Sequence, residues 1–125
     1  MAKFVLVDDS KVARGFLKGL LENNGHQVVA EGSDGIEGLY LYKKHKPDVI
    51  CLDVVMPEIT GLDCLKQIME ADPAAKVVLV TSVGKESLIE EAKKMGAKAV
   101  LTKPINEQLV LELVASLGGL RNIGL

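Results

Sequence analysis

Four short apolar runs in this chain are each followed by side chains that can do chemistry: carboxylates, a hydroxyl and an ammonium. The runs and the residues that close them are 4–7 with Asp8 and Asp9, 49–52 with Asp53, 77–80 with Thr81, and 99–102 with Lys103 and Pro104. If every run is a strand of one parallel sheet, the carboxyl ends share one edge and these side chains gather there.

The three carboxylates predict a site for a divalent cation. Two carboxylates about 5 Å apart repel by about 3 kcal/mol at an effective dielectric constant near 20, so three are costly without a cation or a bound proton. Hard oxygen ligands suit Mg²⁺, which keeps several waters and binds one or two carboxylates together with phosphate oxygens. We expect Asp9 and Asp53 to coordinate the ion directly and Asp8 to act through a metal-bound water. Such a pocket can also accept a phosphoryl group.

Amphipathic segments of helical period separate the apolar runs, which include a fifth at residues 28–30. Runs that are apolar throughout are typical of strands covered on both faces of a parallel sheet. The alternation of strand and helix, repeated five times, predicts an α/β fold with a doubly wound parallel sheet. Neither a linker nor a repeat divides the 125 residues, which are expected to form one domain.

Each predicted helix has an apolar face, and several have a cap. Ser10, Asp34 and Asn106 are placed as N-caps, Glu37 completes a capping box with Asp34, and Gly25 ends a helix. The helices, with the residues expected to face the core, are 11–24 (Val12, Phe16, Leu17, Leu20, Leu21), 35–45 (Ile36, Leu39, Tyr40), 62–71 (Leu62, Leu65, Ile68, Met69), 85–95 (Leu88, Ile89, Ala92, Met95) and 106–117 (Leu109, Val110, Leu113, Val114, Leu117).

Composition indicates a soluble, cytoplasmic protein that binds neither nucleic acid nor a membrane. The formal net charge is −2 with both signs interspersed, and the apolar stretches are far shorter than the roughly 20 residues of a membrane span. Hydrophobic residues make up 48% of the chain and aromatic residues only 3%, so the core should be aliphatic. Cys51 and Cys64 are expected to be buried thiols without a disulfide. His26 and His45 form no metal-spaced cluster.

Taken alone, Asp8 and Asp9 could simply form a turn and cap the next helix. The full set of motifs resembles the receiver domain of bacterial two-component signalling, and the chain is similar in size to the stand-alone chemotaxis response regulators. The motifs are Val-Asp-Asp-Ser at 7–10, Leu-Asp-Val-Val-Met-Pro at 52–57 with Gly61 after it, Val-Thr-Ser at 80–82 and Thr-Lys-Pro at 102–104. The match extends from about Lys3 to Leu117.

The resemblance implies a flavodoxin-like fold, with five parallel strands in the order 2-1-3-4-5 and five flanking helices. Residues 1–117 would form the receiver domain, and residues 118–125 a tail or the start of a linker. The implied function is a phosphorylation-activated switch in which Asp53 accepts a phosphoryl group from a sensor histidine kinase or phosphotransfer protein, with Mg²⁺ required. Because such a domain phosphorylates itself and only weakly removes the group, its status as an enzyme stays open.

The resemblance also implies roles for other side chains. Lys103 would contact the phosphoryl oxygens, aimed by a cis bond before Pro104, and Thr81 would turn inward to donate a hydrogen bond to the phosphoryl group. The backbone carbonyl of Val55 would join the three aspartates at the metal. Small Ser82 would leave the site open to a donor or to water.

Two positions depart from the family pattern. Val100 stands where the family often has Tyr or Phe, so the inward swing of a ring must be weakened or replaced by backbone movement of residues 82–85. Val55 stands two residues after Asp53, where a polar side chain is common, which leaves the phosphoryl lifetime open.

The implied output surface is the fourth helix, the last strand and the last helix, which would bind a downstream protein. Leu111 lies off the apolar stripe of the last helix, either as a partner or dimer contact or as a chance exposed leucine. The residues expected on this surface are Glu90, Glu91, Lys94, Lys98, Val100 and Gln108.

Two other functions stay open. One is a receiver-like protein-binding module that is never phosphorylated, which the valines at 55 and 100 favour and the intact acidic set opposes. The other is a flavin- or nucleotide-binding protein of the same fold. Residues 8–11 lack the glycine- or hydroxyl-rich cradle that a nucleotide phosphate needs, which argues against it.

Overall fold

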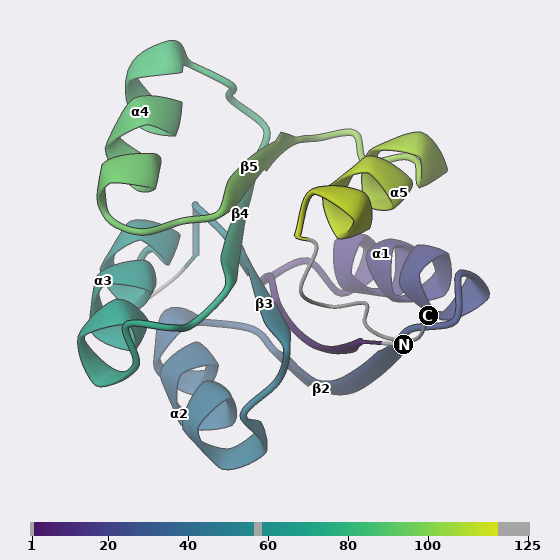
Figure 1. Ribbon diagram of the computed structural model, residues 1–125, viewed down its shortest axis with the longest axis horizontal. Helices are drawn as coiled ribbons and strands as arrows, with labels where there is room; N and C mark the ends of the chain where they lie inside the picture. Colours follow the sequence, from purple (N-terminus) through teal and green to yellow (C-terminus); the bar gives the residue numbers. More distant parts are fainter. Residues whose placement is uncertain (1, 57–58, 118–125) are drawn as a thin grey trace.

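Five parallel strands form the centre of the computed structural model, which describes residues 2–56 and 59–117 (Figure 1). They are β1 (Lys3–Val7), β2 (Gln27–Gly32), β3 (Val49–Asp53), β4 (Val77–Thr81) and β5 (Ala99–Thr102). Their order across the sheet is β2-β1-β3-β4-β5, which confirms the predicted order. Residue 1, Pro57 and the predicted tail at 118–125 lie outside the described residues.

A helix follows each strand, with ends within one residue of the predicted ones. The helices are α1 (Lys11–Asn23), α2 (Gly35–His45), α3 (Gly61–Ala71), α4 (Glu86–Lys94) and α5 (Glu107–Ser116). Ser10, Asp34 and Asn106 are N-caps as predicted, since each side chain accepts a hydrogen bond from the amide three residues further on. Thr60 caps α3 in the same way, although the sequence analysis did not identify it.

Alternate side chains of the strands enter two cores, one on each face of the sheet. In β1, Phe4 and Leu6 belong to the core under α1 and α5, whereas Val5 and Val7 belong to the core under α2, α3 and α4 (Figure 1). Successive side chains of a strand point to opposite faces, so a strand covered on both sides is apolar at every position. The prediction of a doubly wound sheet is confirmed.

Two expectations from composition can be checked in the described residues. Cys51 and Cys64 are buried in different cores as free thiols, and burial raises the pKa of each to about 12, so neither is reactive near neutral pH. Among the helices at 2–56 and 59–117, none combines the length and the apolar character needed to cross a bilayer.

Helix α1 exposes two residues that the periodicity placed in the core. Val12 is 82% exposed and Phe16 is 55% exposed, while Leu17 and Leu21 are buried as predicted. The first turns of α1 stand beside the carboxyl edge of the sheet, where Val12 and Phe16 line an open groove and do not cover a strand. The prediction was therefore wrong for these two residues.

Helix α2 exposes two of the three residues predicted to face the core, whereas the third, Leu39, packs against the core as predicted. Ile36 and Tyr40 are 54% and 61% exposed, and Tyr42 is buried instead. The position of Gly38 explains the exposure of these two residues. A Cβ on Gly38 would lie 3.0 Å from the Sγ of Cys64, so only a glycine allows this close approach to α3. The helix approaches α3 through its glycine side, which directs the larger apolar residues at 36 and 40 to solvent.

The corrected face of α1 can be tested by substitution. Leu21→Ala should lower the free energy of unfolding by about 2–5 kcal/mol, because this fully buried side chain would leave a cavity. Val12→Ala should change it by no more than about 0.5 kcal/mol in either direction. Urea unfolding followed by circular dichroism measures both, and a comparable loss in the two variants would place Val12 in the core.

Candidate functional site

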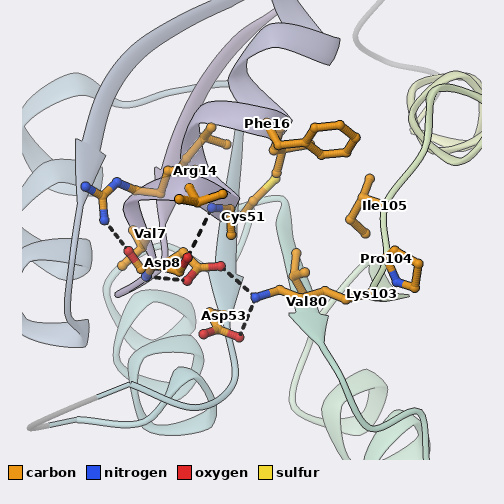
Figure 2. A pocket seen from close by; sticks show the side chains of 15 residues that line it. Val7, Asp8, Arg14, Phe16, Cys51, Asp53, Val80, Lys103, Pro104 and Ile105 are labelled. Carbon is orange, nitrogen blue, oxygen red and sulfur yellow. Dashed lines mark hydrogen bonds and ion pairs between the residues drawn. The ribbon is translucent and has the colours of Figure 1, made fainter.

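The polar side chains at the strand ends meet at the carboxyl edge of the sheet, as predicted. Asp53 ends β3 and Thr81 ends β4, whereas Asp8 and Lys103 directly follow β1 and β5. Figure 2 shows Asp8, Asp53 and Lys103 pointing toward one another from three different strands. Residues far apart in the chain therefore share one site.

Asp8, Asp9 and Asp53 form a cluster of carboxylates. One oxygen of each lies within 4.8 Å of the other two, with Asp8 and Asp53 buried and Asp9 exposed. Three oxygen donors with one open side fit a hard cation that keeps part of its water shell, such as Mg²⁺. The predicted cluster is thus present. The division into direct and water-mediated ligands, and the use of the Val55 carbonyl, remain predictions.

Lys103 bridges two of these carboxylates. Its Nζ donates to Asp8 Oδ2 at 2.9 Å and lies 3.8 Å from Asp53 Oδ1. The peptide bond between Lys103 and Pro104 is cis, as the resemblance implied. The two contacts of its Nζ show that the lysine is directed into the site, whereas its contact with a phosphoryl group remains a prediction.

The charge of the cluster changes the acidity of Asp53. Burial, and next the charge of Asp8, raises the pKa of the Asp53 carboxyl from 3.8 to about 6, with Lys103 opposing the rise and Asp9 adding to it. Burial lowers the pKa of Lys103, but the hydrogen bond to Asp8 and the charges of the aspartates outweigh it, so the net shift is upward. One ammonium thus compensates the three carboxylates only in part.

Asp8 is also held by the start of α1. Its Oδ1 accepts the Ser10 amide at 2.8 Å, and its backbone carbonyl accepts Nη1 of Arg14 (Figure 2). Asp8 therefore forms a turn, as the simpler interpretation held, and belongs to the cluster as well. Arg14 was not among the predicted site residues. The position of Arg14 in the sequence does not indicate a role at the site, because Arg14 contacts the backbone of Asp8 and not its side chain.

Thr81 is buried at the end of β4, and its hydroxyl is engaged by the next loop. Thr81 Oγ1 donates to the carbonyl of Val83 at 3.2 Å and accepts the Val83 amide at 3.0 Å. The side chain therefore lies at the predicted strand end with a backbone partner. A hydrogen bond from Thr81 to a phosphoryl oxygen would require this arrangement to change.

The loop after Asp53 runs close to the strand that it leaves. A Cβ on Gly61 would collide with the backbone carbonyl of Asp53, so this position requires glycine. Val55 is 71% exposed at the rim, and Val100 is partly buried in β5 against the core under α2, α3 and α4. Of the two departures from the family pattern, Val55 thus lies beside the site, and Val100 lies in the strand that leads to Lys103.

An apolar groove of about 500 Å³ opens beside the carboxylates. Phe16 of α1 and Ile105 after β5 stand on opposite sides of it, with Asp53 and Lys103 at one end (Figure 2). The apolar periodicity of α1 gave no indication of this groove, because it placed Val12 and Phe16 in the core.

A family model for the response regulator receiver domain matches residues 4–115 of this chain. The chain belongs to this family. The match spans nearly the whole range over which the motifs suggested a receiver domain, and it includes every residue of the carboxylate cluster as well as Thr81 and Lys103.

Named relatives agree with this assignment. The chemotaxis protein CheY of Listeria monocytogenes is 39% identical over 112 residues, which cover 90% of this chain and 94% of that protein. CheY of Thermotoga maritima is 36% identical over 110 residues, covering 88% and 92%. A crystal structure of a CheX–CheY–BeF3–Mg²⁺ complex from Borrelia burgdorferi matches with a TM-score of 0.89 at 34% identity, covering 91% of this chain and 87% of that chain.

These relationships establish a chemotaxis-like receiver domain of two-component signalling. A receiver domain is a phosphorylation-activated switch with a kinase or phosphotransfer partner and downstream targets. Family membership also argues against the flavin- or nucleotide-binding alternative.

Removal of one charge from the cluster should stabilise the metal-free protein. The pKa of the Asp53 carboxyl is about 6 in the folded protein, above its ordinary 3.8. The contribution of the protonated carboxyl to the free energy of unfolding is therefore fully present below about pH 4 and is lost as the pH rises through about 6. This pKa shift corresponds to at most about 3 kcal/mol, and screening by water reduces that value. We therefore expect the free energy of unfolding of Asp53→Asn to exceed that of the wild type by about 1–2 kcal/mol at pH 7.5.

Urea unfolding in a chelator at pH 7.5 and at pH 4 measures this gain. The advantage of Asp53→Asn should largely vanish at pH 4, and Glu90→Gln, which removes an exposed charge on α4, serves as the control. A destabilised Asp53→Asn at pH 7.5 would contradict the account of the cluster.

Proposed function

We propose that Asp53 accepts a phosphoryl group from a phosphohistidine on a sensor histidine kinase or phosphotransfer protein. One oxygen of the Asp53 carboxylate attacks phosphorus, the bond from phosphorus to the imidazole nitrogen breaks, and the nitrogen keeps the electron pair. The observation that carries the proposal is the position of Asp53 beside the Lys103 ammonium, in a cluster with two further carboxylates.

Among the three aspartates, Asp53 is the best placed nucleophile. Asp8 has one oxygen on the Ser10 amide and the other on Lys103 Nζ at 2.9 Å, so neither is free to attack. Asp53 has a longer contact of 3.8 Å with the same ammonium. Asp9 is exposed at the rim, where it suits a metal ligand better than a nucleophile held at a fixed position.

The donor set supports a requirement for Mg²⁺. Asp9, Asp53 and the backbone carbonyl of Val55 would hold the ion, with Asp8 bound through water. When bound, the cation supplies positive charge to the phosphoryl oxygens, which is most of what phosphoryl transfer requires. The chain itself adds the Lys103 ammonium, already directed toward Asp53, and a buried setting in which charge interactions are strong.

Phosphorylation would then shift the loop that follows β4. The new oxygens attract the Thr81 hydroxyl, which must give up its bond to the Val83 carbonyl. Because the Val83 amide also binds Thr81 Oγ1, the movement of the hydroxyl passes directly to residues 82–85. This route requires no aromatic ring at Val100. To shift the ratio of active to inactive conformations from 1:99 to 99:1, phosphorylation must favour the active conformation by about 5.5 kcal/mol. A few charge-assisted hydrogen bonds of about 1.5–3 kcal/mol each can supply this free energy.

The proposed output surface, formed by α4, β5 and α5, would lie next to this loop. A Cβ on Gly84 would be 2.7 Å from Thr102 Oγ1, so the loop and the end of β5 are in close contact, and a movement of the loop would reach β5. Leu111 is 46% exposed on α5. A downstream protein, and neither nucleic acid nor a membrane, would bind this surface through exposed residues that include Glu90, Glu91, Lys94, Lys98 and Gln108, beside the partly buried Val100.

Acetyl phosphate with Mg²⁺ should add one phosphoryl group to this protein, because the site needs only a reactive phosphorus and a cation. Intact-mass spectrometry measures the addition, and peptide mapping should place it on Asp53. Asp53→Asn and a chelator should each abolish it. An unmodified wild-type protein, or a group that persists in Asp53→Asn, would favour the alternative of a receiver-like module that works by docking alone.

Thr81→Ala should separate phosphorylation from switching. The variant should still be labelled on Asp53, because Thr81 does not perform the attack. In the wild type, phosphorylation should protect the amides of residues 82–85 from hydrogen exchange. In the variant, the gain in protection should be smaller by at least about half, because one of a few hydrogen bonds to the phosphoryl group is lost. Ser82→Ala, at an exposed neighbouring position, is the control. An identical response in Thr81→Ala and wild type would contradict the proposed route.

A further inference from the structure

We infer that Arg14 is a positioning residue for this site, because it fixes the peptide that joins Asp8 to Asp9. The inference rests on the proposed function, in which the cluster binds Mg²⁺ and accepts a phosphoryl group. Arg14 itself touches none of the three carboxylate groups in the contacts of the described residues.

Arg14 connects three elements of the fold. From α1, its Nη1 donates to the backbone carbonyl of Asp8, and its Nε lies 3.2 Å from Glu31 Oε1 on β2. Lys18, one turn further along α1, lies 3.5 Å from the other oxygen of Glu31. The Arg14 side chain is only 16% exposed, so the guanidinium is held between the edge strand and the end of β1.

The carbonyl of Asp8 depends on this contact. The Asp8 amide continues the ladder by donating to Gly32 O at 3.1 Å, but within 2–56 and 59–117 no backbone amide donates to the Asp8 carbonyl. The Asp8 side chain is held separately, by Ser10 and Lys103. Because a peptide group is planar, fixing the carbonyl of residue 8 also fixes the amide and the Cα of Asp9. Arg14 thereby orients the exposed carboxylate that the metal would use.

Position, and not charge, is what Arg14 contributes. Its positive charge faces Glu31, which it shares with Lys18, whereas Lys103 is the cation that contacts the carboxylates of Asp8 and Asp53. Groups that orient metal ligands without touching the metal typically change metal affinity by 10–100-fold when they are removed.

The test is the affinity for Mg²⁺, measured by isothermal titration calorimetry on the full chain. Arg14→Met keeps the apolar stem and loses the contact with Asp8. It should bind Mg²⁺ about tenfold more weakly than the wild type. Lys18→Met is the matched control, because Lys18 shares Glu31 but has no contact with Asp8, and it should bind like the wild type. Thermal unfolding in a chelator reports separately on stability.

A second variant keeps the test informative if Arg14→Met does not fold. Arg14→Lys preserves the charge but replaces the separate donors Nε and Nη1 with a single nitrogen on a stem without the planar fork, so it should also lose Mg²⁺ affinity. Unchanged affinity in the Arg14 variants, or an equal loss in Lys18→Met, would overturn the inference and leave the proposed function intact. Failure of the wild-type protein to bind Mg²⁺ would overturn both.

Discussion

Crowded negative charge at one edge of the sheet is the constraint on which the rest of this structure depends. Three carboxylates have oxygens within 4.8 Å of one another, and a single ammonium lies between two of them. Burial, and next the charge of Asp8, raises the pKa of Asp53 to about 6 even though Lys103 opposes the rise. A cation that binds among these carboxylates therefore lowers the free energy of the folded protein. In the proposed function, a bound cation and the Lys103 ammonium would together supply the positive charge that phosphoryl oxygens require.

The fold concentrates charge in this way because its strands are parallel and buried on both faces. Two aliphatic cores hold the strands in place, and the polar residues are confined to the carboxyl ends. The short connections then set the details. Ser10 caps α1 and binds Asp8, and Gly61 allows the next loop to pass close to Asp53. The hydroxyl of Thr81 binds the loop before α4, and in the proposed function this contact would carry a local change of charge toward a partner surface.

Much of this arrangement could be predicted from the sequence, for definite reasons. Apolar runs followed by Asp53, Thr81 and Lys103 identify strand ends and their chemistry, whereas the strand order came from the family resemblance and not from periodicity. Periodicity failed at Val12, which lines the groove beside the sheet edge, and at Ile36, because α2 approaches α3 through its glycine side; an apolar stripe reports neither feature. Arg14 could not be found, because it acts through a backbone carbonyl. The partner of the Thr81 hydroxyl depends on loop geometry that no residue pattern reports.

The most direct test of the central claim is a titration of isotope-labelled wild-type protein with Mg²⁺, followed through its backbone amide resonances by NMR. If crowded carboxylates create the site, the shifts should be saturable, reversed by a chelator, and largest at residues 8–10 and 53–55. Resonances that stay unchanged there, or that respond mainly at acidic residues elsewhere on the surface, would contradict the account.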